Sequence, residues 1–132
     1  MRIYLTHCSA KKKASLKNTK EKVTPDILYT ATPTQRFMTR CKEKGVNWAI
    51  FSDKYGVWFP HVKHEWYEKD PHTVTDYEFT QLLEDFQSKL RNYEKIYFYR
   101  NRGRFHPLYK KLLKVTKLRN RITFISHLED IS

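Results

Sequence analysis

Near the start of the chain, residues 3–9 read Ile3-Tyr4-Leu5-Thr6-His7-Cys8-Ser9, and the predicted fold is built around them. The first four of these residues form a short apolar run that is typical of a buried strand, and the polar residues after them mark the end of that strand. Similar short runs occur at Asn47–Phe51, Ile96–Tyr99 and Arg121–Ile125. The sequence therefore predicts four strands.

Two helices begin with recognisable capping residues. Thr32 and Pro33 are expected to be the N-cap and the first helical residue of one helix, which Gly45 ends. Thr75 and Glu78 match the capping box of a second helix, whose apolar residues recur at helical spacing. Its apolar face is expected to hold Phe79, Leu82, Leu83, Phe86 and Leu90.

A third helix is predicted to begin at His106-Pro107, with Leu108, Leu112 and Val115 on its apolar face. Strands and helices then alternate, and each connection is long enough to carry a helix across the sheet, which requires parallel neighbours. We therefore expect one α/β domain over residues 1–132. Its predicted architecture is a three-layer helix-sheet-helix arrangement with a four-stranded, mostly parallel sheet.

Positive charge is concentrated in parts of the chain. The sequence has 26 Lys and Arg against 14 Asp and Glu, a formal net charge of +12. Residues 100–121 hold nine basic residues and no acid, and residues 11–22 hold six Lys and one Glu. One interpretation is a solvated basic face. The other, which we favour, is a surface for RNA, DNA or a nucleotide. A membrane partner is not expected, because no helix combines a basic face with a wide apolar one.

Cysteine and histidine patterns do not predict a metal or a disulfide. Cys8 and Cys41 are the only cysteines, and they form no CxxC pair. His61, His64 and His72 lie at spacings that match no defined zinc pattern. We therefore expect no metal and no other cofactor. The N-terminal residues do not resemble a secretory signal, so a cytoplasmic location is expected. The oligomeric state is not indicated.

Polar segments follow the predicted strands, and the ligands of open parallel sheets bind beyond the carboxyl ends of the strands. We therefore expect these segments to form one basic rim that binds phosphate or nucleic acid. The residues expected to bind it are Lys11, Lys12, Ser52, Lys54, Tyr55, Gly56, Arg100, Arg102 and Arg104.

Cys8, Ser9 and Asp53 are the candidate catalytic residues of this rim. Lys11 is close to Cys8 in sequence, and a nearby cation lowers the pKa of a thiol. Cys8 is therefore a candidate nucleophile or ligand contact, with simple packing as the alternative. Ser9 is better suited to bonding a phosphate than to attack. Asp53 can act as a general base or orient a ligand hydroxyl, or it can be a turn residue paired with a lysine.

Residues 52–72 are predicted to form a long loop, and structureless loops of this length are usually functional. Its aromatic residues are interpreted either as a cluster that fixes the loop to the body or as a stacking platform for bases. These residues are Trp58, Phe59, Trp66 and Tyr67.

Three stretches of the sequence carry a family resemblance. Cys8-Ser9-Ala10-Lys11-Lys12, Leu28-Tyr29-Thr30 and residues 51–60 resemble a family of small uncharacterised bacterial and archaeal proteins. Its pattern is Cys-Ser-x-x-Lys, then Leu-Tyr, then Ser-x-Lys-Tyr-Gly. The first stretch is also similar to the uracil-DNA-glycosylase-like domain of archaeosine synthases and tRNA-guanine transglycosylase homologues. The resemblance implies a compact α/β fold that handles nucleic acid or a nucleobase. This chain lacks the water-activating Gly-Gln-Asp-Pro-Tyr-like motif of the glycosylases.

Three functions are consistent with these observations. The leading hypothesis is an enzyme, or a domain derived from one, that acts on a nucleotide or nucleobase. The alternatives are a non-catalytic nucleic-acid-binding module, in which Cys8 only packs, and a sensor of a small nucleotide.

Overall fold

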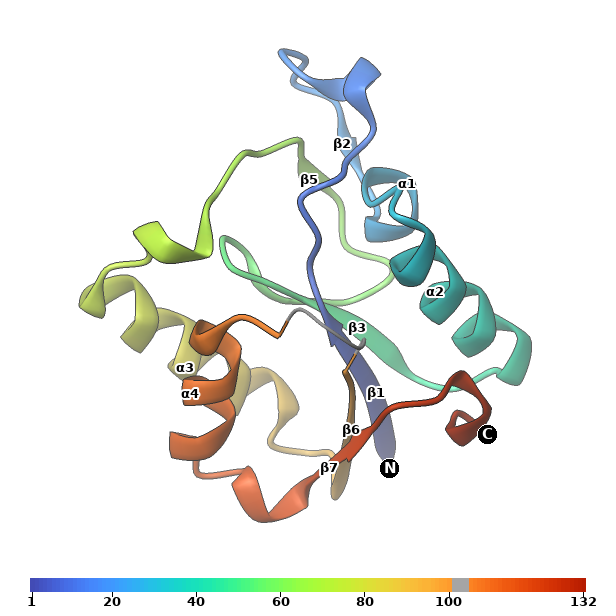
Figure 1. Cartoon of the computed structure of the whole chain (residues 1–132), viewed down its shortest axis with the longest axis vertical. Coiled ribbons are helices and arrows are strands. Elements are labelled where there is room, and N and C mark those ends of the chain that lie inside the picture. The colour runs from blue at the N-terminus through green and yellow to red at the C-terminus, as the bar shows by residue number, and fades with distance from the viewer. Residues whose placement is uncertain (101–104) are drawn as a thin grey trace.

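A computed structural model of the chain describes residues 1–100 and 105–132. It shows a mixed α/β fold around a five-stranded sheet with the strand order β4-β3-β1-β6-β7 (Figure 1). The strands are β1 (Arg2–His7), β3 (Trp48–Ser52), β4 (Gly56–Trp58), β6 (Lys95–Tyr99) and β7 (Ile122–Ile125).

Four of these strands are the predicted ones, and they run parallel to their neighbours. The prediction of a four-stranded sheet is wrong by one strand. The chain turns back at residues 53–55, so that β4 pairs antiparallel with β3 as a fifth strand at the edge of the sheet. The turn was included in the loop predicted over residues 52–72, because three paired residues are too few to show a strand pattern.

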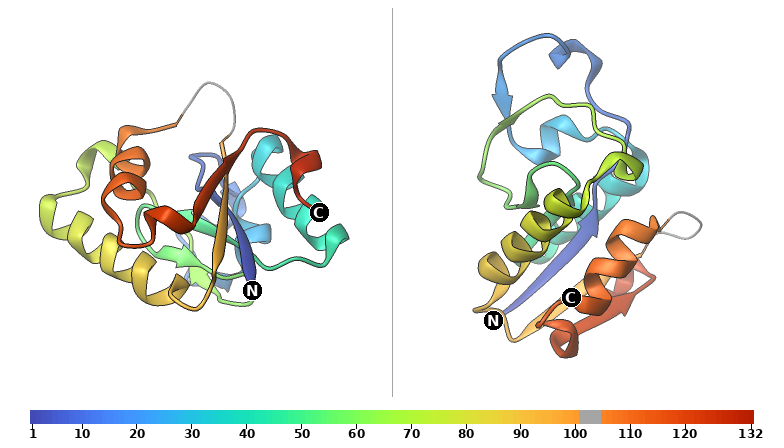
Figure 2. Two further views of the ribbon diagram at one scale, coloured as in Figure 1. Left: turned by 90° about the horizontal axis from the view of Figure 1, so that it is seen from below. Right: turned by 90° about the vertical axis from the view of Figure 1, so that its left-hand side faces the viewer.

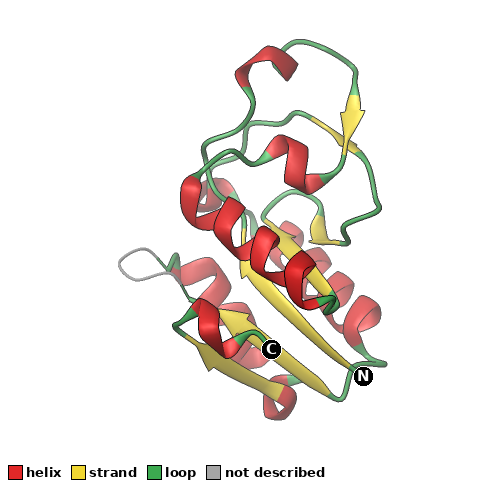
Figure 3. Cartoon of the chain, turned by 90° about the vertical axis from the view of Figure 1, so that its right-hand side faces the viewer, coloured by secondary structure: helices red, strands yellow, loops and turns green. Residues whose placement is uncertain are grey.

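The helices are α1 (Pro25–Leu28), α2 (Thr32–Lys44), α3 (Asp76–Leu90) and α4 (Pro107–Val115). The last three are the predicted helices, and α1 is a single additional turn. Figures 1 and 3 show α2 running beside the sheet. Within the described residues, no helix has both the length and the apolar composition needed to cross a membrane.

Local capping residues set the ends of the helices. The Thr75 side chain accepts a hydrogen bond from the Glu78 backbone N–H, and the Glu78 carboxylate accepts one from the Thr75 N–H, so the capping box is confirmed. Gly45 ends α2 with a left-handed φ of 62°. The N-cap of α2 is Ala31, one residue before the predicted Thr32.

A second, two-stranded sheet joins the end of the lysine-rich segment to the loop predicted over residues 52–72. β2 (Lys22–Val23) pairs antiparallel with β5 (His64–Glu65), at the top of the view in Figure 1. Leu16 and Val23 of the lysine-rich segment are buried beside it. Nonlocal pairing therefore orders both segments, although each strand has only two residues.

Alternate residues of the strands face two separate buried clusters. Ile3 and Leu5 of β1 pack with residues of α3 and α4, whereas Tyr4 packs with residues of α2. Figure 2 shows α3 and α4 lying together, away from α2. The buried face of α4 differs from the predicted one, because it holds Tyr109, Leu112 and Leu113, while Val115 is 49% exposed.

Gly56 closes the turn between β3 and β4 in a conformation that suits glycine. Its φ is +73°, and a Cβ atom at this position would overlap the carboxylate of Asp85. That carboxylate accepts a hydrogen bond from the Val57 N–H at 2.7 Å and forms an ion pair with Lys89 at 2.8 Å. The turn therefore needs both the left-handed backbone and the missing side chain.

Gly56→Ala is expected to lower the free energy of unfolding more than Gly45→Ala. Both positions have a left-handed backbone, which costs an L-residue about 1–2 kcal/mol. Nothing lies within 4 Å of a Cβ at Gly45, whereas at Gly56 the Asp85 contacts must break, which adds about 1 kcal/mol or more. Urea unfolding of the two variants measures the difference. Equal losses would show that Asp85 does not restrict this turn.

Candidate functional site

A pocket of about 440 Å³ opens at the carboxyl edge of the four parallel strands. Residues 7–12 after β1 and Asp53 after β3 line it. The N-terminal part of α4 contributes His106 and Tyr109, and the segment between β5 and α3 contributes Tyr67, Lys69 and Pro71. Segments far apart in the sequence therefore meet at the predicted edge of the sheet.

Next to the pocket, the chain leaves two neighbouring strands toward different buried clusters. β1 and β6 are adjacent. After β1 the chain continues to α2, which packs with Tyr4, and after β6 it continues to α4, which packs with Ile3 and Leu5. Such divergence leaves a crevice at the strand ends, which is where open α/β sheets bind ligands.

Cys8, Asp53 and Tyr109 form a hydrogen-bonded group in this pocket. The Cys8 thiol donates to Asp53 Oδ1 at 3.6 Å, and its sulfur lies 3.0 Å from the Tyr109 hydroxyl. Because the thiol proton is directed to the carboxylate, the Tyr109 O–H donates to Cys8 Sγ. Two of the three candidate catalytic residues are therefore in contact, and Tyr109 is a third member that the sequence did not indicate.

Burial determines the protonation of this group. It raises the pKa of Cys8 to about 11, and the negative charge of Asp53 contributes in the same direction. The expectation that Lys11 lowers this pKa is therefore wrong, and Cys8 is a neutral thiol near pH 7. Burial also raises the pKa of Asp53, while the Cys8 hydrogen bond and the charge of Lys12 act against that rise.

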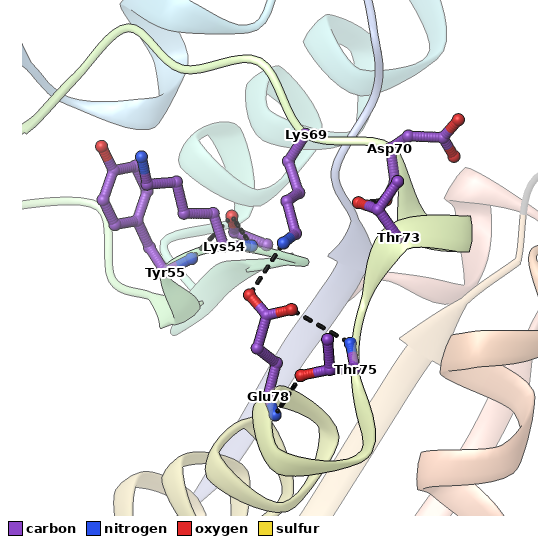
Figure 4. Close-up of polar contacts among 8 residues, drawn as sticks. Lys54, Tyr55, Lys69, Asp70, Thr73, Thr75 and Glu78 are labelled. Atoms are coloured by element: carbon purple, nitrogen blue, oxygen red, sulfur yellow. Dashed lines mark hydrogen bonds and ion pairs between the residues drawn. The ribbon is translucent and has the colours of Figure 1, made fainter.

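Lys11, Lys12 and Lys69 bring positive charge to the pocket. Lys69 is paired with Glu78 of α3 at 2.8 Å, as Figure 4 shows. Lys12 Nζ lies 4.4 Å from the centre of the Tyr67 ring, and burial lowers the pKa of this lysine. Within the described residues, neither Lys11 nor Lys12 forms an ion pair. These two lysines are therefore available to an anion.

His7 and Ser9 complete the part of the pocket that follows β1. His7 Nδ1 donates to the Cys8 carbonyl oxygen at 2.8 Å, so Nε2 carries the lone pair. That Nε2 is buried and has no hydrogen-bond partner in the described part of the chain. It can accept a hydrogen bond from a ligand. The Ser9 hydroxyl accepts one from Thr34 Oγ1 at 3.3 Å.

Ser52 was predicted to bind phosphate, but its hydroxyl is hydrogen-bonded within the protein. It is fully buried, and its Oγ accepts hydrogen bonds from the N–H groups of Lys54 and Tyr55 at 3.1 and 3.0 Å. Its hydroxyl donates to the Tyr67 hydroxyl at 3.1 Å, and the Tyr67 hydroxyl lies 2.5 Å from that of Tyr29. This network fixes the turn that positions Asp53.

Lys54, Tyr55 and Gly56 lie outside the lining of the Cys8 pocket and border a separate pocket with Glu78 and Asp85. The Tyr55 ring already stacks on His64, with a centroid distance of 3.9 Å and an interplanar angle of 2°. Trp58 and Tyr67 are buried in the body, which favours the interpretation that the aromatic residues fix the loop.

Arg100 lies beside the pocket rather than in its lining. Its guanidinium is 5.4 Å from the centre of the Phe105 ring and 5.1 Å from that of Phe124. Arg102 and Arg104 lie outside the described residues. Among the described histidine, cysteine and carboxylate side chains, no group of three could hold a metal ion.

Sequence reasoning missed Tyr67, Lys69, His106 and Tyr109 as pocket residues. The first two lie within the aromatic loop, where nothing local indicates which side chains turn inward. A partial signal existed for His106, because His106-Pro107 marks a helix start shortly after a strand end. His106 caps α4 by accepting the Leu108 N–H at 3.0 Å.

Comparisons with protein-family models, curated proteins and solved structures found no match.

Alkylation of Cys8 by iodoacetamide is expected to be slow at pH 7 and to rise with a midpoint near pH 11, because only the thiolate reacts. Asp53→Asn removes a neighbouring negative charge and is expected to lower this midpoint. Peptide mass spectrometry separates Cys8 from Cys41, and circular dichroism at each pH confirms that the protein is folded. A midpoint below pH 9 in the unmodified protein, or one that Asp53→Asn leaves unchanged, would contradict the burial and charge of this thiol.

Proposed function

We propose that the protein binds a nucleotide, either free or as a unit of RNA or DNA, in the pocket at the strand ends. The observation that carries this proposal is the presence of two unlike kinds of polar group in one pocket. Lys11 and Lys12 offer ammonium groups to a phosphate, and the Asp53 carboxylate and His7 Nε2 offer acceptors to N–H or O–H groups. A phosphate with a base and a sugar presents both kinds of partner.

The size and position of the pocket support the same proposal. A volume of about 440 Å³ lies within the range of small-ligand sites. The division of the helices between two buried clusters supports a three-layer helix-sheet-helix fold, and folds of this kind bind ligands beyond the carboxyl ends of their strands.

The residues of the family resemblance also support it. Cys8 and Lys12 of the Cys-Ser-x-x-Lys stretch line the pocket, and the Tyr29 hydroxyl of the Leu-Tyr pair is hydrogen-bonded to that of Tyr67 in its wall. The resemblance implies the handling of nucleic acid or a nucleobase.

Lys12→Gln is expected to weaken the binding of a nucleoside monophosphate by about tenfold, because a charge-assisted hydrogen bond to phosphate is lost. Lys44→Gln is the matched control, since it makes the same charge change on an exposed residue at the end of α2, away from the pocket. Isothermal titration calorimetry with the monophosphates of all common bases measures both. Failure of every monophosphate and of short oligonucleotides to bind would refute the proposal.

A second candidate function is catalysis on the bound nucleotide. The contact between the Cys8 thiol and Asp53 favours it, because a carboxylate within hydrogen-bond reach of a thiol can accept its proton and so act as a general base. The raised pKa of Asp53 makes this carboxylate a stronger base. In the non-catalytic alternative, the same contact only satisfies two buried groups.

If the pocket is catalytic, incubation with RNA and DNA oligonucleotides is expected to change a nucleoside mass or to release a base. Cys8→Ser and Asp53→Asn are then expected to slow that change by about 100-fold or more, while oligonucleotide binding persists in Cys8→Ser. Cys41→Ala is the cysteine control. Liquid chromatography with mass spectrometry of the digested nucleosides gives the readout. Unaltered turnover in both pocket variants would leave the protein as a binding module.

A further inference from the structure

The helix α4 carries solvent-exposed lysines that have no acidic partners on the same helix. Lys110, Lys111 and Lys114 are exposed, and the helix contains no acidic residue. In the described part of the chain, none of the three pairs with a carboxylate within 4.0 Å. Lys110 and Lys114 are one turn apart, where like charges destabilise a helix. A bound polyanion would remove this repulsion.

Acidic residues of the neighbouring helix do not offset this charge. α3 lies beside α4 in Figures 1 and 2. Of its four acidic residues, Asp76 and Glu84 form no ion pair with a described lysine, and the other two already have cationic partners. Glu78 is paired with Lys69, and Asp85 is paired with Lys89. Lys111 lies over the Phe79 ring of α3, at 4.6 Å from its centre, rather than against an acid.

An exposed aromatic ring adjoins this helix. Phe124, on the edge strand β7, is 44% exposed. It packs edge-on against Phe105, which comes directly before the N-cap of α4, at a centroid distance of 6.2 Å. Arg100 lies over both rings. Aromatic rings and guanidinium planes are surfaces on which unpaired bases stack.

The lysines of α4 lie next to the pocket. His106 and Tyr109 line the pocket, and Lys110 is the next residue of the helix. Lys114 lies roughly 6 Å further along the helix axis. We define the α4 basic surface as Arg100, Lys110, Lys111, Lys114 and Phe124.

We propose that the α4 basic surface binds the single-stranded nucleic acid on one side of the nucleotide held in the pocket. The ligand is then a polynucleotide rather than a free nucleotide. This inference rests on the proposed function. Lysines without acidic partners complement the negative charge of a chain of phosphates, and the exposed ring of Phe124 offers a surface on which unpaired bases can stack. An anionic membrane fits less well, because a helix that binds a membrane surface needs a broad apolar face toward the lipid, and α4 packs all its apolar residues except Val115 in the core.

Fluorescence anisotropy with labelled RNA and DNA oligonucleotides of increasing length tests this inference, alongside calorimetry with the monophosphate. The test variant is Lys110→Gln/Lys114→Gln. The control is Lys44→Gln/Lys95→Gln, which makes the same charge change at exposed residues at the opposite edge of the sheet, where β3 and β6 begin. We expect the test variant to bind a twelve-nucleotide strand about 20-fold more weakly at 0.1 M salt and to reduce the salt slope by about 1.4. The control variant should match the unmodified protein.

Phe124→Leu separates stacking from charge, because it keeps an apolar side chain and removes the ring. We expect it to weaken binding to the single strand by about fivefold and to leave the salt slope unchanged. Thermal denaturation of each variant confirms that the fold is retained.

The outcomes distinguish this inference from the proposed function. If the monophosphate binds the pocket and longer strands gain no affinity, or if both double variants weaken binding equally, the α4 basic surface is not a nucleic-acid site and the pocket proposal stands. If strands bind through α4 while Lys12→Gln has no effect on any ligand, the surface stands and the pocket proposal fails. Binding to phosphatidylserine vesicles but not to oligonucleotides, with the same loss in the test variant, would overturn the inference in favour of a membrane partner.

Discussion

The candidate site depends on the parallel pairing of β1 with β3 on one side and β6 on the other. This pairing fixes the carboxyl end of β1 from both directions. The Cys8 N–H donates to the Phe51 carbonyl at 2.9 Å, and the Thr6 hydroxyl donates to the Tyr99 carbonyl at 3.0 Å. Cys8 is thereby held beside Phe51, two residues before Asp53. Without the pairing of β1 with β3 and β6, the Cys8 thiol and the Asp53 carboxylate would not be held within hydrogen-bond distance of each other.

A buried polar network supports this arrangement. Buried hydroxyl groups are costly unless they are hydrogen-bonded, and the hydroxyls of Tyr29, Ser52 and Tyr67 bond to one another. The network joins the segment before α2, the turn after β3 and the segment after β5. The turn that this network holds also positions Asp53, an acid that is only 4% exposed in a chain whose net charge is +12. A buried acid near lysines is the arrangement on which we base the proposed ligand site.

Local signals predicted the elements whose causes are local. The Thr75 capping box and Gly45 begin and end helices through hydrogen bonds within one turn, so they could be identified from neighbouring residues. The short strands β2, β4 and β5 could not be identified, because two or three residues form a strand only when a distant partner supplies the other half. The buried face of α4 shifted for a related reason, because Tyr109 contacts Cys8 across 101 positions.

The four parallel strands, the three main helices and the polar residues at the strand ends, including Cys8 and Asp53, could be predicted from the amino-acid sequence. What those residues can do depends on the folded chain. In the fold, Ser52 is buried within a turn, Tyr55 stacks on His64, and the pKa of Cys8 is raised where the sequence favoured a lowered one. A pKa depends on burial and on nearby charges, and neither is visible in neighbouring residues. For Cys8 the larger cause is burial, and the second is the charge of Asp53, 45 positions away.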